Sequence, residues 1–289
     1  MTDVAAEAQQ AGTLVTLAVL LAAVLHATWN ALAHGVADRM IGFSLIGVTY
    51  TAVGAVVVMF TGPPAPEAWP LVLASAAVHV LYQFGLLVSY RLGEFSQVYP
   101  LARGTSPWVV TLLSAVLLGQ RIPAVQLAGV LVVSAGLLSL VFVGGMPGRT
   151  AVPGLLAAFG TGLLIATYTV IDGVGVHRTG VLGYAAWMFL LQGPALPLAG
   201  WASRRRSFLS GLRRHWRGGI AGGLVSMAAY GIVLWAQTRA TLGPVAALRE
   251  TSIVFGALLG AIFLGERMGR GRAVLAGVVV AGIVLIDLA

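Results

Sequence analysis

Residues 40–61 read MIGFSLIGVTYTAVGAVVVMFT, an uncharged and mostly apolar stretch. A helix needs about 20 such residues to cross the hydrocarbon core of a bilayer, so the stretch predicts a transmembrane helix. The same criterion, applied outward along the chain, predicts ten spans: 13–33, 40–61, 69–90, 95–118, 123–143, 152–174, 181–200, 218–238, 243–264 and 271–287. Continuous apolar runs favour helices, because the strands of a membrane barrel alternate with a period of two. We therefore expect an all-α integral membrane protein with ten transmembrane helices.

The composition of the chain agrees with this class. Of the 289 residues, 58% are hydrophobic and 9% are charged, whereas a soluble domain carries about 25% charged residues. The chain has no cysteine, and all 17 basic residues are arginine. Disulfide scaffolds, thiolate zinc sites, cysteine nucleophiles, Schiff bases and P-loops are therefore excluded. We expect no cofactor and no metal site. The acidic first twelve residues lack the basic region of a cleaved signal peptide.

The second half of the chain repeats the first in the same order. Residues recur at separations of 146 or 148 in three groups: Tyr82 and Arg91 with Tyr230 and Arg239; Arg103, Thr105, Ser106, Gly119 and Arg121 with Arg249, Thr251, Ser252, Gly265 and Arg267; and Leu127-Ala128-Gly129 with Leu275-Ala276-Gly277. Each half holds five spans, an odd number, so the second half enters the membrane from the opposite side. We expect two five-helix inverted repeats, 1–147 and 148–289, around one central cavity, which is an architecture of transporters.

The arginines outside the spans are unevenly divided between the two sides of the predicted membrane. Twelve lie in the loops on one side and three on the other. By the positive-inside rule, both termini are expected outside the cytoplasm. Six of the twelve lie between Arg204 and Arg217, where we expect a topology signal in contact with anionic lipid headgroups; a regulatory or nucleic-acid role is the alternative. No domain surrounds this cluster, so we expect no nucleic-acid partner.

Charged residues inside the spans are candidates for function, because each costs roughly 2.5–3.5 kcal/mol to insert at a helix centre. Arg103 and Arg249 occupy matching positions in the two halves, and Glu250 follows the second. We expect the two guanidiniums to face one central cavity and to contact substrate. The alternative is that each pairs with Glu250 or a carbonyl and only holds helices together. Pro100 and Pro107 flank Arg103 and predict a broken helix that lines the cavity.

Polar and aromatic side chains at helical spacing extend the candidate site. The expected substrate contacts are Arg103, Arg249, Tyr99, Glu250, His26, Trp29, Asn30, His79, Tyr82, Tyr168, Tyr230, Ser106 and Ser252. The candidates for proton coupling are Glu250, His26, His79 and Asp172. Each histidine can equally serve as an interhelical hydrogen-bonding residue. Asp172 lies near a predicted helix end, where solvation is the alternative.

The last spans of the two halves, 123–143 and 271–287, are rich in small residues. Small residues allow helices to approach closely. We expect these two spans to pack against each other or against a second protomer, so the protein is either a monomer or a homodimer.

The chain resembles the ten-span EamA-type branch of the drug/metabolite transporter superfamily over essentially its whole length. The resemblance rests on the duplication and on four motifs: His26-Ala27-Thr28-Trp29-Asn30-Ala31, Tyr99-Pro100-Leu101-Ala102-Arg103-Gly104, Leu118-Gly119-Gln120-Arg121 and Leu264-Gly265-Glu266-Arg267. Gln120 departs from the family pattern, which has an acid there. The resemblance implies a cavity lined by spans 1, 3, 4, 6, 8 and 9, and export of small metabolites, including amino acids, across a bacterial inner membrane. Its members are commonly described with cytoplasmic termini, which is opposite to the arginine-based prediction.

Together these features predict a secondary active transporter. We expect an exporter of a small polar metabolite, such as an amino acid or related carboxylate, that works by alternating access and has no enzymatic activity. Import or facilitated passage of the metabolite is the alternative on the same fold. Alternatives from other classes are a membrane-embedded lipid-modifying enzyme, with His26, His79 and Glu250 as acid–base groups, and a non-transporting interaction subunit. The expected partners are a small-molecule substrate and the lipid bilayer, with protons as a candidate coupling ion.

Overall fold

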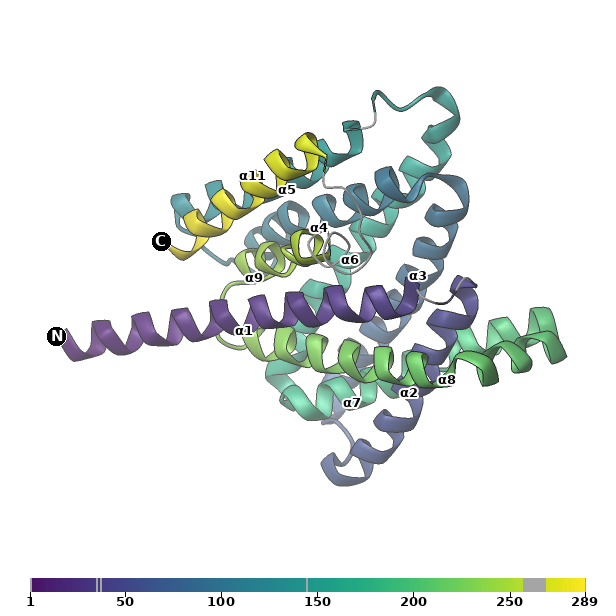
Figure 1. The fold of residues 1–289 in the computed structure, drawn as a ribbon. Helices are drawn as coiled ribbons and strands as arrows, with labels where there is room; N and C mark the ends of the chain where they lie inside the picture. Colours follow the sequence, from purple (N-terminus) through teal and green to yellow (C-terminus); the bar gives the residue numbers. More distant parts are fainter. Residues whose placement is uncertain (1, 35, 37, 144, 257–268, 289) are drawn as a thin grey trace.

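The computed structural model describes residues 2–34, 36, 38–143, 145–256 and 269–288. In these residues the secondary structure is helical and contains no strand. The elements are α1 (Thr2–His34), α2 (Arg39–Thr61), η1 (Pro66–Ala68), α3 (Trp69–Leu92), α4 (Phe95–Leu118), α5 (Ala124–Ser139), η2 (Leu140–Phe142), η3 (Arg149–Ala151), α6 (Val152–Thr179), α7 (Val181–Gln192), α8 (Ala195–Gln237), α9 (Leu242–Arg249) and α11 (Arg270–Asp287). Figure 1 shows them as one bundle.

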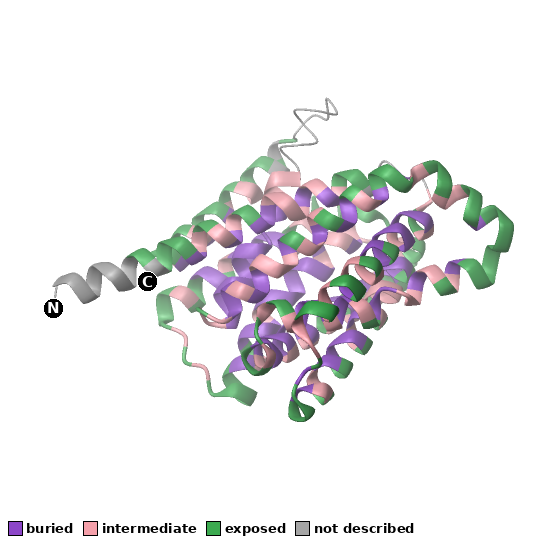
Figure 2. Ribbon diagram, turned by 90° about the horizontal axis from the view of Figure 1, so that it is seen from below, coloured by how far each residue is buried: buried purple, intermediate pink, exposed green. Residues whose placement is uncertain are grey.

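The outer face of the bundle is apolar. Met59, Phe60 and Val116 are 74%, 81% and 71% exposed, and buried residues gather between the helices (Figure 2). Large exposed apolar surfaces of this kind mark a protein that contacts lipid rather than water. Among the described residues, seven helical segments are long and apolar enough to cross a bilayer. The chain is therefore a multi-pass integral membrane protein.

The ten-span count is not confirmed, for three physical reasons. The predicted spans 181–200 and 218–238 lie, apart from Thr238, in the single candidate segment Val181–Gln237, which is counted once although it folds back on itself. The predicted span 243–264 begins as the eight-residue helix α9, and its second half lies outside the described residues. The last predicted span corresponds to α11, whose apolar part, Ala273–Asp287, is shorter than a full crossing. The five-plus-five inverted repeat stays a prediction.

The segment Val181–Gln237 reverses direction within α8. The backbone of Arg205 leaves helical geometry, with φ 44° and ψ −114°. A Cβ atom added to Gly200 would lie 2.4 Å from the ring of Phe208. Residues eight apart in a straight helix are about 12 Å apart along its axis, so this approach requires the chain to fold back at Arg205.

The first arm of this helical hairpin lies before Arg205 and the second arm lies after it. The two arms run in opposite directions along α2. Residue numbers on the first arm fall as those on α2 rise, whereas numbers on the second arm rise with them. The close pairs are Gly54 with Leu190 and Gly47 with Pro197 on the first arm, and Leu45 with Gly219 and Thr49 with Gly223 on the second. The segment Val181–Gln237 therefore consists of two antiparallel helical arms.

The helices α5 and α11 pack against each other at the edge of the bundle (Figure 1). A Cβ atom on Gly282 would lie 2.9 Å from the carbonyl oxygen of Gly129 and 2.7 Å from the side chain of Val133. This contact confirms, within one chain, the expected packing of the two small-residue spans. The hydroxyl of Thr16 donates to Asp287 at 2.9 Å, which ties the end of α11 to α1.

The expected break in the span containing Arg103 is wrong. Helix α4 continues through Pro100 and Pro107, as membrane helices can where neighbouring groups satisfy the backbone positions that a proline frees. The break lies instead in the matching span of the second half. Helix α9 ends at Arg249, residues 250 and 251 form a turn, and helix resumes over 252–256.

Candidate functional site

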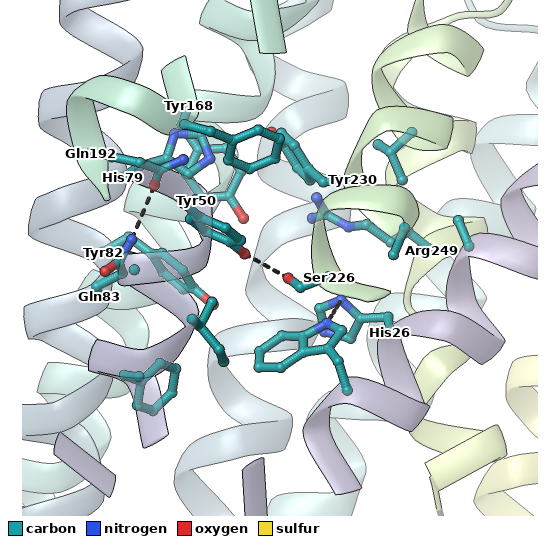
Figure 3. Close-up of a pocket in the computed structure, with 18 residues that line it drawn as sticks. His26, Tyr50, His79, Tyr82, Gln83, Tyr168, Gln192, Ser226, Tyr230 and Arg249 are labelled. Carbon is teal, nitrogen blue, oxygen red and sulfur yellow. Dashed lines mark hydrogen bonds between the residues drawn. The ribbon is translucent and has the colours of Figure 1, made fainter. Parts of the chain in front are cut away.

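A cavity lies among the helices, between α1, α2, α3, α6, α7, α8 and α9 (Figure 3). Its volume is about 70 Å³, which holds several waters, since one water needs roughly 10–15 Å³ on the same measure. Its lining residues are Ala22, His26, Trp29, Phe43, Ile46, Gly47, Tyr50, His79, Tyr82, Gln83, Tyr168, Phe189, Gln192, Ser226, Ala229, Tyr230, Val233 and Arg249. An apolar wall with a few convergent polar groups is typical of a small-molecule site.

The structure divides the residues expected to contact substrate into two groups. Seven of them line the cavity: His26, Trp29, His79, Tyr82, Tyr168, Tyr230 and Arg249. The other six, Tyr99, Arg103, Asn30, Ser106, Glu250 and Ser252, are absent from that lining. The implied set of lining helices is also corrected, because α2 and α7 contribute and α4 does not. Arg103, the charged residue of α4, is held behind the cavity by other side chains.

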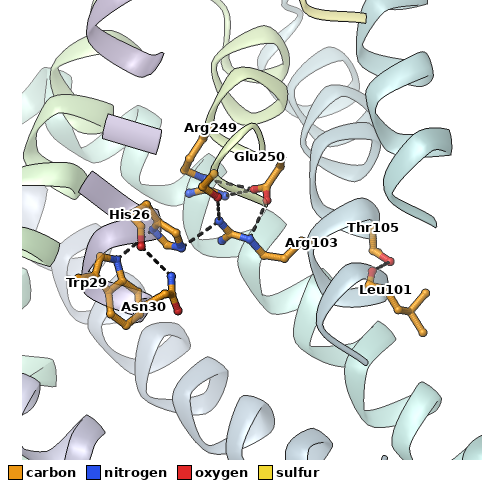
Figure 4. A network of polar contacts seen from close by, with 9 residues as sticks. His26, Trp29, Asn30, Leu101, Arg103, Thr105, Arg249 and Glu250 are labelled. Atoms are coloured by element: carbon orange, nitrogen blue, oxygen red, sulfur yellow. Dashed lines mark hydrogen bonds and ion pairs between the residues drawn. The ribbon is translucent and has the colours of Figure 1, made fainter. Parts of the chain in front are cut away.

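Arg103 and Arg249 share one carboxylate instead of facing each other across the cavity (Figure 4). The Nε atom of Arg103 lies 2.7 Å from Oε2 of Glu250, and Nη2 of Arg249 lies 3.3 Å from Oε1. All three side chains are buried. Glu250 is the one acid within 4.0 Å of either guanidinium in the described part of the chain. Two positive charges against one negative charge leave a net charge of +1.

His26 lies between two groups that can only donate hydrogen bonds. Nη2 of Arg103 is 3.0 Å from its Nε2 atom, and the indole nitrogen of Trp29 is 3.2 Å from its Nδ1 atom. A neutral imidazole has a single acceptor nitrogen, and a protonated one has none. In one of the two contacts, an N–H group of Arg103 or Trp29 therefore faces an N–H group of His26 or a nitrogen that cannot accept its hydrogen. An acceptor on a bound solute would relieve that conflict.

The remaining members of the predicted site hold this charged cluster in place. Ser252 accepts a hydrogen bond from Arg103 at 3.1 Å, and the amide of Asn30 donates to the His26 carbonyl at 2.9 Å. The ring of Tyr99 lies 5.8 Å from the Arg103 guanidinium. Ser106 is fully buried, and its hydroxyl makes no hydrogen bond to any described residue.

A second polar cluster surrounds Asp172. The solvated position considered for this residue is wrong, because its side chain is fully buried. Three hydroxyl groups donate to its carboxylate: Ser75 of α3, Tyr184 of α7 at 2.7 Å, and Tyr230 of α8. A buried carboxylate is costly unless it is hydrogen-bonded or paired, and these three donors satisfy it. Asp172 thus joins four helices.

His79 connects the Asp172 cluster to the cavity. Its Nε2 atom lies 3.9 Å from Oδ2 of Asp172, while its Nδ1 atom lies 3.0 Å from the Ser75 carbonyl. Because a carbonyl only accepts, Nδ1 carries the hydrogen and Nε2 is the basic nitrogen. The imidazole stacks on Tyr168 with ring centroids 3.9 Å apart. His79 therefore presents a proton acceptor between the cavity and a buried carboxylate.

The predicted site did not include several residues that complete the two clusters and the cavity wall. Tyr50 and Ser226 are hydrogen-bonded at 2.6 Å, and Gln83 donates to Gln192 at 3.0 Å. Ser75 and Ser226 precede His79 and Tyr230 by four residues, a spacing that places each serine on the same helix face and could have identified it. No comparable signal marks Tyr184, which approaches Asp172 from a different helix. The described residues contain no group of three acids or histidines that could hold a metal ion.

The arrangement is that of a multi-pass membrane protein with a cavity among its helices, walled mainly by apolar groups with several polar ones between them. Residues 152–287 match the model of the EamA-like transporter family. This match covers somewhat less than half of the chain, so it shows that the second half is similar to this transporter family. It is consistent with a protein that is not an enzyme.

The overall fold has a counterpart among solved structures. One crystal structure aligns with a TM-score of 0.77 over 96% of this chain and 97% of its own length, at 20% sequence identity. At that identity the likeness concerns the fold alone. The comparison with curated proteins finds no match.

Proposed function

We propose that this protein is a secondary active transporter that exports a small polar metabolite carrying a carboxylate, such as an amino acid, across a bacterial inner membrane. The observation that carries the proposal is the charged cluster beside the cavity. Arg103 and Arg249 share Glu250, and Arg249 lines the cavity. Arginine matches the geometry of a carboxylate and can donate two parallel hydrogen bonds to it.

The net charge of the cluster favours an anionic group on the solute. An uncompensated charge in a water-poor interior is unfavourable, and a solute carboxylate would balance the surplus of +1. The same carboxylate supplies the acceptor that is missing between His26 and its two donors. Both arguments favour the same solute chemistry, and they rest on different contacts.

The two halves of the chain are proposed to alternate access to this site. The repeats 1–147 and 148–289 would rock against each other about the cavity, as in transporters built from inverted repeats. The turn at residues 250 and 251 supports this assignment. Interrupted helices inside membranes occur where their backbone faces protein or a wet cavity.

Transport by purified protein tests the proposal. The chain is reconstituted into proteoliposomes, and exchange of a radiolabelled mixture of the standard amino acids and small organic acids is measured. We expect exchange by the unaltered chain and a loss of about tenfold or more in Arg249→Gln, the scale of a lost charge-assisted contact. Arg149→Gln, on the exposed residue of η3, is the matched control and should transport normally.

Two outcomes would contradict the assignment. Undiminished exchange in Arg249→Gln would remove the arginine from the solute site. Absence of exchange for every solute, in protein that unfolds cooperatively on heating, would argue against a transporter. In a further measurement, the radiolabelled solute is placed only inside or only outside the vesicles. The direction of its net movement shows whether the protein acts in export, import or facilitated passage.

A further inference from the structure

The two ends of the cavity differ in the charge of the groups that lie behind them. Figure 3 shows Arg249 at one end and His79 at the other, with Tyr168 and Tyr230 between them. Behind Arg249 lies the cluster with net charge +1. Behind His79 lies Asp172, whose negative charge has hydroxyl donors but, among the described residues, no full cationic partner, since the neutral imidazole approaches only to 3.9 Å.

A zwitterion complements this charge separation. Its carboxylate at Arg249 would place an ammonium group toward His79 and the rings of Tyr168 and Tyr230. Aromatic faces attract ammonium groups, and the negative charge of Asp172 adds to that attraction. A protonated His79 would place a second cation in the same position.

We propose that His79 and Asp172 form a proton-binding site in which a proton and the ammonium group of a zwitterionic solute exclude each other. The proton binds to the lone pair of His79 Nε2, and the resulting imidazolium is paired with the Asp172 carboxylate. Binding of the solute requires loss of that proton to the cavity. The inference rests on the proposed transport function and adds its coupling ion, so that export of one solute is exchanged for entry of one proton.

The surroundings of the pair support proton binding from the cavity. His79 lines the cavity, whereas Asp172 does not. The ionisable groups that face the pair are Tyr168 on α6, Tyr184 on α7, Tyr230 on α8 and Arg249 on α9. Tyr82 on α3 packs against Tyr168, and Arg103 on α4 is already paired with Glu250. His177 bonds the Gly173 carbonyl of its own helix. Among the groups named here, His79 Nε2 is the basic nitrogen that lies close to the Asp172 carboxylate.

The exchange moves charge in a definite direction. A zwitterion has no net charge, so each cycle carries one positive charge inward with the proton. A membrane potential that is negative inside should therefore speed solute export, in addition to the effect of a pH gradient. This gives the proposal a second readout that holds for any zwitterionic solute.

The test separates coupling from transport. Proteoliposomes containing the full chain are assayed with a radiolabelled mixture of the standard amino acids, first for exchange at equal pH and then for transport driven by an imposed pH gradient. We expect His79→Gln to lower the ratio of the gradient-driven rate to its own equal-pH exchange rate by about tenfold or more, a change within the usual range of coupling energies. His177→Gln is the matched control and should keep both activities.

Binding measurements provide an independent check. In detergent, the apparent dissociation constant of the amino-acid mixture should rise as the pH falls, because protons compete, and His79→Gln should lose this dependence. Asp172→Asn should behave in the same way, and His79→Gln keeps the test valid if the aspartate variant fails to fold.

Several results would overturn the proposal while leaving the transport function intact. These are a wild-type rate that ignores both pH gradient and membrane potential, stimulation by a sodium gradient instead, or equal losses of exchange and gradient-driven transport in His79→Gln. A wild-type chain that exchanges no solute would overturn the transport function itself and the coupling with it.

Discussion

At the scale of single residues, the site depends on Glu250. Its carboxylate balances part of the charge of two buried guanidiniums, with contacts at 2.7 and 3.3 Å. Replacing one partner of a buried pair leaves an uncompensated charge, which typically costs 3–5 kcal/mol, so about that loss is expected in Glu250→Gln.

Thermal unfolding of the purified protein checks this prediction. Glu250→Gln should lower the midpoint by several degrees. Glu67→Gln, on an exposed residue of η1, should leave it nearly unchanged. Equal midpoints for the two variants would mean that Glu250 contributes little to the pairing.

Sequence reasoning identified most of the ionisable residues of the two clusters, and it gave the pairing of the arginines with Glu250 as the alternative to substrate contact. The spacing of His26 and Trp29 implied a shared helix face, and the side chains are hydrogen-bonded. Adjacent residues on a regular helix point about 100° apart, so a continuous helix would separate the side chains of Arg249 and Glu250. The helix ends at that point, and the turn lets the two side chains meet. Tertiary packing decides such pairings.

At the scale of helices, the reversal in α8 makes a specific prediction. Arg205 has a positive φ, which L-residues adopt only at a cost of about 1–3 kcal/mol, whereas glycine adopts it freely. Arg205→Gly should therefore raise the thermal midpoint.

The neighbouring residue supplies the matched control. Arg206 has ordinary helical geometry, so Arg206→Gly should lower the midpoint by the roughly 1 kcal/mol that glycine costs in a helix. If both variants shifted the midpoint in the same direction, the assigned turn at Arg205 would be wrong.

The contact between α5 and α11 gives a second prediction at this scale. A Cβ on Gly282 would lie 2.7 Å from Val133, while one on Gly277 would meet nothing within 4 Å. Gly282→Ala should destabilise the protein by about 1–3 kcal/mol through overpacking. Gly277→Ala, on the same helix, should be neutral or slightly stabilising. Thermal unfolding of both variants measures the difference, and equal shifts would contradict the close approach.

Helix boundaries could be predicted from hydropathy more readily than helix continuity. The predicted spans 40–61 and 95–118 agree closely with α2 and α4. Pro100 and Pro107 suggested a break in α4 that does not occur, whereas the turn at residues 250 and 251 has no proline within it. Backbone bonds lost at a proline can be replaced by packing, and packing is not visible in a single sequence.

At the scale of the whole molecule, the uneven arginine distribution predicts the orientation. The hairpin turn near Arg205 should lie in the cytoplasm, and the segment around Ala65 on the opposite side. The chain has no cysteine, so a single introduced cysteine reports its side of the membrane without background.

Impermeant thiol labelling of intact cells measures this orientation. Ser210→Cys, on an exposed position of α8, should react only after the membrane is opened, whereas Ala65→Cys should react directly. The reverse pattern would place both termini in the cytoplasm, as is common in the resembling family.

The pairing of α5 with α11 also has a consequence for biogenesis. The two helices are separated by 130 residues of chain, and synthesis proceeds at about 5–20 residues per second. For roughly 7–26 s after α5 is made, its glycine-lined face is therefore not yet covered by α11 in the membrane. The pairing of α5 therefore forms only after α11 has left the ribosome. In chains that stop before α11, the uncovered face of α5 should mark them for degradation.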